Sequence, residues 1–117
     1  MDFFHKQEVL LLEDDLLLAK RISACIEDKG GEVVHCSTIQ EAKNALNSFS
    51  FDAALLDLNL PDGVSLELLG DQFIPENVLT ILMTGESGIR PAVEAMRLGA
   101  VDYLSKPFDL EELPLIF

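Results

Sequence analysis

The chain has 117 residues, a length that fits one compact domain. Hydrophobic residues make up 49% and charged residues 25%, which is the balance of a globular core with a solvated surface rather than of a disordered chain. Lys and Arg number 8 against 21 Asp and Glu. The net charge of -13 disfavours binding of nucleic acid or anionic lipid through this domain, because such binding needs clustered cations.

The sequence carries no sign of export or of a membrane anchor. Its two cysteines, Cys25 and Cys36, form no CxxC motif and suggest no disulfide framework. Residues 1–6 lack the basic-then-apolar order of a signal peptide, and no apolar run approaches the roughly 18 residues of a membrane span. We therefore expect a cytoplasmic domain that contacts neither a membrane nor nucleic acid.

Short apolar runs alternate with amphipathic stretches along the chain. Residues 9–12 have the length and composition of a strand buried on both faces. Residues 16–29 carry apolar side chains at helical spacing, and Asp15 can cap that helix. The glycines at 30–31 supply the backbone freedom that the helix end requires.

The same alternation then repeats. Residues 32–36 are predicted as a second strand, and residues 39–47 as a second helix. Thr38 and Glu41 match a capping box at the start of that helix. Residues 53–56 form a third apolar run and predict a third buried strand.

The second half of the chain keeps to this order. A turn is expected at 61–63, followed by a short helix over 64–69. Residues 78–83 predict a fourth strand, residues 89–98 an amphipathic helix and residues 100–104 a fifth strand.

Five strand–helix units with short apolar strands predict one α/β domain, a doubly wound five-stranded parallel sheet covered on both faces. Asp109 can cap a last helix, which is cut short at Phe117. We therefore expect this helix to continue in a longer protein. In sheets of this kind, ligands bind at the carboxyl ends of the strands.

Polar residues follow four of the predicted strands at that edge: Glu13, Asp14, Asp57, Thr84 and Lys106. Each of them alone has an ordinary interpretation as a helix cap, a turn residue or a surface charge. Together they place three carboxylates and one amine in a single cleft, and like charges brought together cost energy unless something balances them.

Mg2+ is the cation that would balance these charges, because it prefers oxygen ligands from one or two carboxylates, waters and phosphate groups. The histidines and cysteines lack the spacing of a Zn2+ site. A carboxylate can attack phosphorus, with Lys106 and Thr84 binding the phosphoryl oxygens. The sequence has no GxxxxGK[ST] loop, so we expect no ATP binding of that kind.

Four segments carry a family resemblance: residues 12–15, 56–63, 83–85 and 99–108. In this order and spacing they resemble the receiver domain of two-component response regulators, and the resemblance covers about residues 7–117. It implies a flavodoxin-like fold with strand order 2-1-3-4-5.

The resemblance also implies a role for each residue of the acidic edge. Asp57 is the expected phosphoacceptor. Asp14 and Asp57 would bind Mg2+ directly, together with the backbone carbonyl of Asn59. Glu13 would bind the ion through a water molecule, and Glu at this first acidic position is a common variant of Asp.

Other residues carry the expected response to phosphorylation. Thr84 and Lys106 would bind the phosphoryl oxygens, and Thr84 with Tyr103 would form the family's switch, in which the aromatic ring turns inward. Packing alone favours an ordinary core or edge aromatic at Tyr103, and its place just before Ser105-Lys106-Pro107 is what favours the switch role. The peptide bond before Pro107 is expected to be cis.

The function implied is a phosphorylation-controlled signalling switch that catalyses only its own phosphorylation and dephosphorylation. The phosphoryl donor would be a phosphohistidine on a sensor histidine kinase or a histidine phosphotransfer protein. The fourth helix, fifth strand and fifth helix would form the readout face, a possible homodimer surface, and would control an output domain for transcription.

Two other functions stay open. Phosphohydrolases of the haloacid dehalogenase type also use a strand-end Asp with Mg2+, but they need a second acid two residues further on, where this chain has Asn59. A pure interaction module would keep the fold without the chemistry. The joint presence of Asp14, Asp57, Thr84 and Lys106 argues against it.

Overall fold

The computed structural model describes residues 7–71, 73–85 and 89–106, with the side chains of 89–92 left out. Five parallel strands form one sheet in the order β2-β1-β3-β6-β7. Their bounds are β1 Glu8–Leu12, β2 Glu32–Cys36, β3 Ala53–Asp57, β6 Leu79–Thr84 and β7 Asp102–Ser105. The order of these strands along the chain is 2-1-3-4-5, so the predicted parallel sheet and its topology are confirmed.

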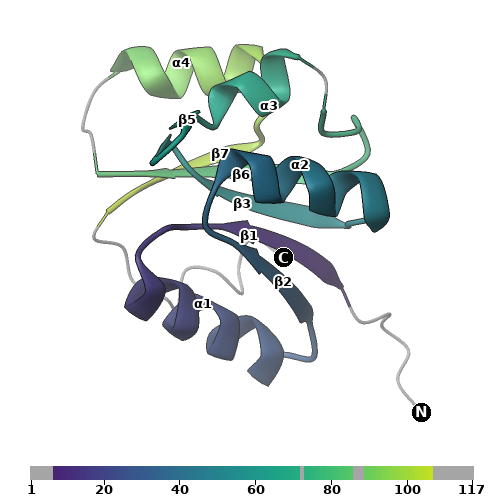
Figure 1. Ribbon diagram of the computed structural model, residues 1–117. Helices are drawn as coiled ribbons and strands as arrows, with labels where there is room; N and C mark the ends of the chain where they lie inside the picture. Colours follow the sequence, from purple (N-terminus) through teal and green to yellow (C-terminus); the bar gives the residue numbers. More distant parts are fainter. Residues whose placement is uncertain (1–6, 72, 86–88, 107–117) are drawn as a thin grey trace.

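Helices cover both faces of the sheet (Figure 1). Helix α1 (Leu16–Asp28) lies on one face. Helices α2 (Ile39–Ser48), α3 (Leu66–Gly70) and α4 (Ile89–Arg97) lie on the other. The helix expected from Asp109 falls outside the described residues. Within the described residues, no helix has both the length and the apolar character needed to cross a membrane.

The core consists of two hydrophobic layers, one on each face of the sheet. Neighbouring residues of a strand point to opposite faces. Val9 and Leu11 of β1 therefore pack with Ile22 of α1, while Leu10 and Leu12 pack in the cluster that contains Ala42 of α2. The whole of β3 is buried, which accounts for its continuous apolar run.

The two predicted helix caps that fall within the described residues, Asp15 and Thr38, are present. The Oδ1 atom of Asp15 accepts hydrogen bonds from the backbone N–H groups of Leu17 and Leu18, at 3.1 and 3.2 Å. The Oγ1 atom of Thr38 accepts the N–H of Glu41 at 3.1 Å. These bonds satisfy donors that the first turn of a helix leaves without a partner, so each fixes where its helix begins.

The segment after β3 differs from the sequence prediction. Strand β4 (Asn59–Leu60) pairs antiparallel with β5 (Gly63–Val64), which makes a small hairpin around the turn expected at 61–63. Because residue 64 is extended in this pairing, the helix predicted over 64–69 begins only at Leu66. Gly63 adopts a φ of 148°, a conformation that residues other than glycine rarely adopt.

The last described strand also begins later than predicted. The sequence places it at 100–104, but β7 starts at Asp102. The reason is that the N–H of Ala100 bonds to the carbonyl of Ala95 at 2.9 Å and Gly99 adopts a φ of 115°. Ala100 therefore belongs to the C-terminal cap of α4.

We expect Leu55→Ala to lower the free energy of unfolding by about 2–5 kcal/mol, because it removes a fully buried side chain from the central strand and leaves a cavity. Leu17→Ala is the matched control, since Leu17 is 65% exposed, and its effect should stay within about 0.5 kcal/mol. Urea unfolding followed by circular dichroism measures both. Equal effects would contradict the placement of β3 at the centre of the core.

Candidate functional site

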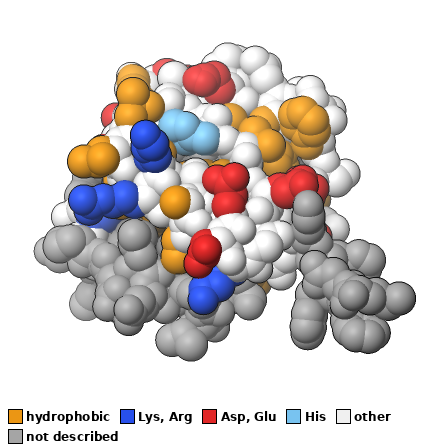
Figure 2. Space-filling model, turned by 90° about the horizontal axis from the view of Figure 1, so that it is seen from below, with side chains coloured by type: hydrophobic (Ala, Val, Ile, Leu, Met, Phe, Trp, Pro, Cys, Tyr) orange, Lys and Arg blue, Asp and Glu red, His pale blue; other side chains and the backbone are white. Residues whose placement is uncertain are grey.

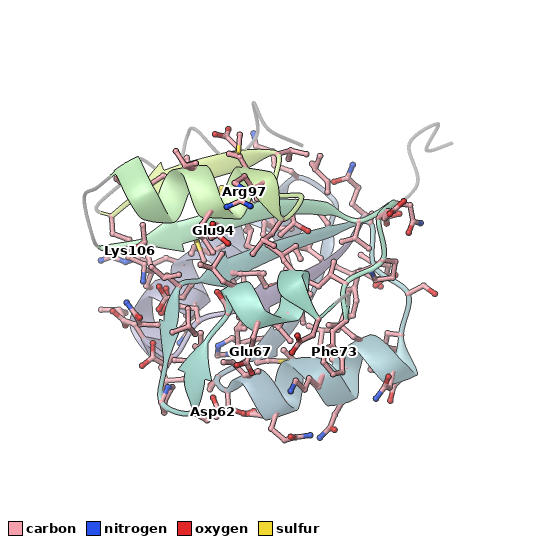
Figure 3. The ribbon with its side chains drawn as sticks, turned by 90° about the horizontal axis from the view of Figure 1, so that it is seen from above. Asp62, Glu67, Phe73, Glu94, Arg97 and Lys106 are labelled. Atoms are coloured by element: carbon pink, nitrogen blue, oxygen red, sulfur yellow. The ribbon has the colours of Figure 1, made fainter. Side chains whose placement is uncertain are left out.

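Four strands deliver polar side chains to one edge of the sheet, where the carboxyl ends of the strands meet. Glu13 directly follows β1, and Asp57 is the last residue of β3. Thr84 is the last residue of β6, and Lys106 directly follows β7. Lys106 is labelled at this edge in Figure 3, beyond the end of the sheet and below the start of α4.

Backbone hydrogen bonds hold the ends of β3, β6 and β7 in register. The N–H of Leu58 donates to the carbonyl of Met83 at 2.8 Å, which fixes the chain just after Asp57. The N–H of Lys106 donates to the carbonyl of Thr84 at 2.7 Å. Asp57, Thr84 and Lys106 are therefore positioned by the sheet itself rather than by flexible loops.

The ammonium group of Lys106 bridges two carboxylates. Its Nζ atom lies 2.5 Å from Oε1 of Glu13 and 3.3 Å from Oδ1 of Asp57. Glu13 is fully buried and Asp57 is buried, whereas Lys106 is partly exposed. A buried ion pair in this geometry is strong only while all its partners are present, because each charge has lost its hydration.

Glu13 is held by further hydrogen bonds. Its N–H donates to the carbonyl of Cys36 at 3.0 Å, and its Oε2 atom accepts the N–H of Asp15 at 3.1 Å. Nε2 of His35 lies 2.7 Å from the backbone carbonyl oxygen of Glu13. No sequence spacing marks this contact between His35 and Glu13, so sequence reasoning missed it.

A group of three acids could hold a metal ion at this edge. One carboxylate oxygen from each of Glu13, Asp14 and Asp57 lies within 4.8 Å of the others. Asp14 is exposed, while the other two are buried, so the group opens to solvent on one side. Hard oxygen ligands of this kind fit Mg2+ or Ca2+. The donor set therefore suits the predicted ion.

Burial and neighbouring charges shift the pKa values of Asp57 and Lys106. Burial, and next the charge of Glu13, raise the pKa of Asp57 to about 7, although Lys106 opposes the shift. Burial alone would lower the pKa of Lys106, but its hydrogen bond to Glu13 and the charges of Asp57 and Glu13 outweigh burial and raise it. Lys106 is thus held as a cation, whereas ionisation of Asp57 costs free energy.

The structure describes three of the four remaining predicted residues. Thr84 is fully buried. Tyr103 is half-buried and packs against the hydrophobic cluster on the face of α2, α3 and α4. Asn59 is exposed at the start of the β4–β5 hairpin. Pro107, with its expected cis peptide bond, falls outside the described residues.

The surface beside the acidic edge, on the α1 side, is mixed in character. Leu16 and Leu17 stand 68% and 65% exposed at the start of α1, directly after the acids that follow β1. On the face drawn in Figure 2, Lys and Arg side chains are interspersed with acidic and hydrophobic ones. This face therefore offers apolar contacts next to the charged group.

The chain belongs to the response regulator receiver domain family, whose pattern matches residues 9–116. It is 40% identical over 106 residues to the swarming motility regulation protein RssB of Serratia marcescens, covering 90% of this chain and 48% of RssB. It is 35% identical over 106 residues to the virulence transcriptional regulatory protein PhoP of Salmonella typhimurium, covering 90% of this chain and 47% of PhoP. The chain thus spans about half the length of these relatives.

Solved structures agree with this membership. The non-phosphorylated HemR receiver domain of Leptospira biflexa has a TM-score of 0.87 and 30% identity, with coverage of 95% of this chain and 90% of that one. A response regulator of Burkholderia pseudomallei, solved with a phosphorylated aspartic acid, a calcium ion and citrate, has a TM-score of 0.87 and 25% identity, with coverage of 95% and 66%.

The raised pKa of Asp57 predicts a pH-dependent stability. Because its folded-state value of about 7 lies above the ordinary 3.8, the stability it contributes is complete below pH 3.8 and is lost as the pH rises to about 7. Without divalent cations, we expect Asp57→Asn to be more stable than the parent by about 2–4 kcal/mol near pH 8. The difference should close near pH 4.

Urea unfolding in EDTA across this pH range measures the difference. Asp71→Asn is the matched control, because it removes the same charge from an exposed position. A constant difference between parent and Asp57→Asn at all pH values would contradict the raised pKa.

Proposed function

We propose that this domain is a phosphorylation-controlled signalling switch in which Asp57 accepts a phosphoryl group from a phosphohistidine. One observation carries the proposal. Asp57 lies at the buried end of the central strand, 3.3 Å from the Lys106 ammonium and within one acidic group with Glu13 and Asp14. Membership of the receiver domain family supports this assignment of roles.

The proposed reaction follows from these positions. A carboxylate oxygen of Asp57 attacks phosphorus, and the bond between phosphorus and the donor's imidazole nitrogen breaks. The imidazole keeps the electron pair and takes a proton from solvent. Lys106 and the hydroxyl of Thr84 donate hydrogen bonds to phosphoryl oxygens, which stabilises the charge that develops there.

The carboxylates of Asp14 and Asp57 and the carbonyl of Asn59 would hold Mg2+ directly, with Glu13 bound through a water molecule. When bound, Mg2+ neutralises negative charge on the phosphoryl oxygens. Glu13 is buried and bonded to Lys106, and both features support binding of the ion through a water molecule rather than directly. The Burkholderia response regulator was solved with both a phosphorylated aspartic acid and a calcium ion, and this supports a role for a divalent cation.

The partner that supplies the phosphoryl group would be a sensor histidine kinase or a histidine phosphotransfer protein. The exposed Leu16 and Leu17 give it an apolar contact beside the acidic edge. The negative charge of the chain argues against nucleic acid or membrane contact by this domain, and a cytoplasmic location suits its two cysteines, which form no disulfide.

The response would pass from Thr84 and Tyr103 to the face formed by α4, β7 and the helix expected from residue 109. That face would control an output domain beyond this one. Relatives named as transcriptional regulatory proteins, such as PhoP, support an output in transcription. It is also the surface for a homodimer. The beryllofluoride-activated NtrC4 receiver domain, at a TM-score of 0.84 and 28% identity, is described as a dimer.

Phosphorylation can be tested with a small donor. Incubated with acetyl phosphate and MgCl2, the parent should gain one phosphoryl group by intact mass spectrometry. Asp57→Asn should gain none, because it lacks the attacking carboxylate, and EDTA should abolish the gain in the parent. Asp71→Asn, which removes an acid at an exposed position, should react like the parent.

Two outcomes would contradict the proposal. An unchanged mass of the parent, together with no Mg2+ binding, would favour an interaction module without chemistry. Sustained phosphate release from a generic ester such as p-nitrophenyl phosphate would favour a phosphohydrolase, although Asn59 stands where such an enzyme needs an acid.

The proposed switch can be followed at Tyr103, since the chain has one tyrosine and no tryptophan. If phosphorylation turns the half-buried ring further inward, quenching of its fluorescence by acrylamide should weaken when acetyl phosphate is added in MgCl2. Asp57→Asn should show no change. Unchanged quenching in a fully phosphorylated parent would contradict the switch role of Tyr103.

A further inference from the structure

Asp62 makes two hydrogen bonds that the function proposed above does not use. Its Oδ1 atom accepts the backbone N–H of Ile39 at 2.9 Å, and its Oδ2 atom accepts that of Gln40 at 3.1 Å. Both donors belong to the first turn of α2, far from Asp62 in the sequence. Figure 3 shows Asp62 at the tip of the β4–β5 hairpin, beside the start of α2.

This carboxylate is a second cap on α2. Thr38 already accepts the N–H of Glu41, so Asp62 satisfies two further donors that the helix leaves without a partner. These backbone bonds, chiefly the one from Ile39, lower the pKa of Asp62 and keep it ionised. The bonds from Ile39 and Gln40 therefore connect α2 to the β4–β5 hairpin, whereas the Thr38 bond connects α2 only to the residue just before it.

The hairpin is also packed tightly at the same place. A Cβ atom on Gly63 would lie only 3.1 Å from Cδ1 of Ile39. Gly63 and Asp62 therefore meet the same residue of α2, one through its side chain and the other through its backbone. The hairpin tip has little room to shift along the helix.

The other end of the hairpin leads directly to the acidic group. The N–H of Ser65 donates to the carbonyl of Leu58 at 2.9 Å, and Asn59 pairs with Val64 across the hairpin. Leu58 itself is bonded to β6 through Met83. The backbone of residues 58–59, next to Asp57, is thus clamped between the sheet on one side and the Asp62 contact on the other.

We propose that Asp62 is a positioning residue for the metal site, because it fixes the hairpin and with it the backbone at Leu58 and Asn59. The inference rests on the proposed function in one respect, the role of the Asn59 carbonyl as a ligand of Mg2+. Asp62 touches neither the ion nor the phosphoryl group and acts through the backbone alone.

The test compares two variants that each remove one cap of α2. Asp62→Ala removes the cap that comes from the hairpin, and Thr38→Ala removes the cap that comes from the preceding residue. Binding of MgCl2 is measured by isothermal titration calorimetry, and amide hydrogen exchange is measured at residues 58–60 and 39–41. We expect the Kd for Mg2+ to rise about three- to tenfold in Asp62→Ala, less than direct partners of metal ligands cost.

Thr38→Ala should loosen the amides of α2 to a similar degree but leave the Kd unchanged. Asp62→Asn keeps one acceptor oxygen, so its Kd for Mg2+ should lie between those of the parent and Asp62→Ala. This variant replaces Asp62→Ala in the test if Asp62→Ala does not fold. Amide hydrogen exchange at residues 58–60 that is faster in Asp62→Ala but not in Thr38→Ala would support the positioning role.

Equal Mg2+ affinity in Asp62→Ala and the parent, or an equal loss in Thr38→Ala, would overturn the inference. A parent that binds Mg2+ but is not phosphorylated would overturn the proposed function and leave this inference standing. A parent that binds no Mg2+ would overturn both.

Discussion

Two buried carboxylates and one ammonium group meet where β1, β3 and β7 end, and the organisation of the molecule follows from keeping them together. Glu13 and Asp57 come from neighbouring strands, but Lys106 comes from the edge strand, with β6 between it and Asp57. Since neighbouring strands are about 4.8 Å apart, only a long side chain can cross that gap. The strand order therefore determines which residue type can provide the positive charge.

This arrangement favours function at the expense of stability. The acids repel one another in a partly dry environment, and Lys106 offsets the repulsion without removing it, as the raised pKa of Asp57 indicates. The cost is tolerable because the strands that carry the acids are the most deeply buried part of the core. Their rigid backbone holds the charges in an arrangement that a flexible loop would relax.

Much of the fold could be predicted because its signals are local. Continuous apolar runs mark the strands, and the caps Asp15 and Thr38 act on residues two and three positions away. The site could be predicted from one further rule, that parallel strands gather their carboxyl ends. This rule brings Glu13, Asp57 and Lys106 into contact, as the structure shows.

What could not be predicted from the sequence depends on distant partners. The bond between His35 and Glu13 spans 22 residues, and that between Asp62 and Ile39 spans 23. No period or spacing marks such pairs. The short hairpin was missed for a related reason, since residues 59–64 are too few to show alternation, and turn residues at 61–63 fit either a loop or a hairpin.

The two faces of the sheet take different parts in the site. Helix α1 follows directly on the acids after β1, so that side supplies charge and an opening to solvent. The residues after Asp57 point the other way: Leu58 and Leu60 are buried in the cluster on the face of α2, α3 and α4, and Tyr103 packs against the same cluster. Packed cores shift as units rather than deform continuously. A displacement of the backbone after Asp57 therefore reaches the α4 side through direct contacts of Leu58 and Leu60 with this cluster.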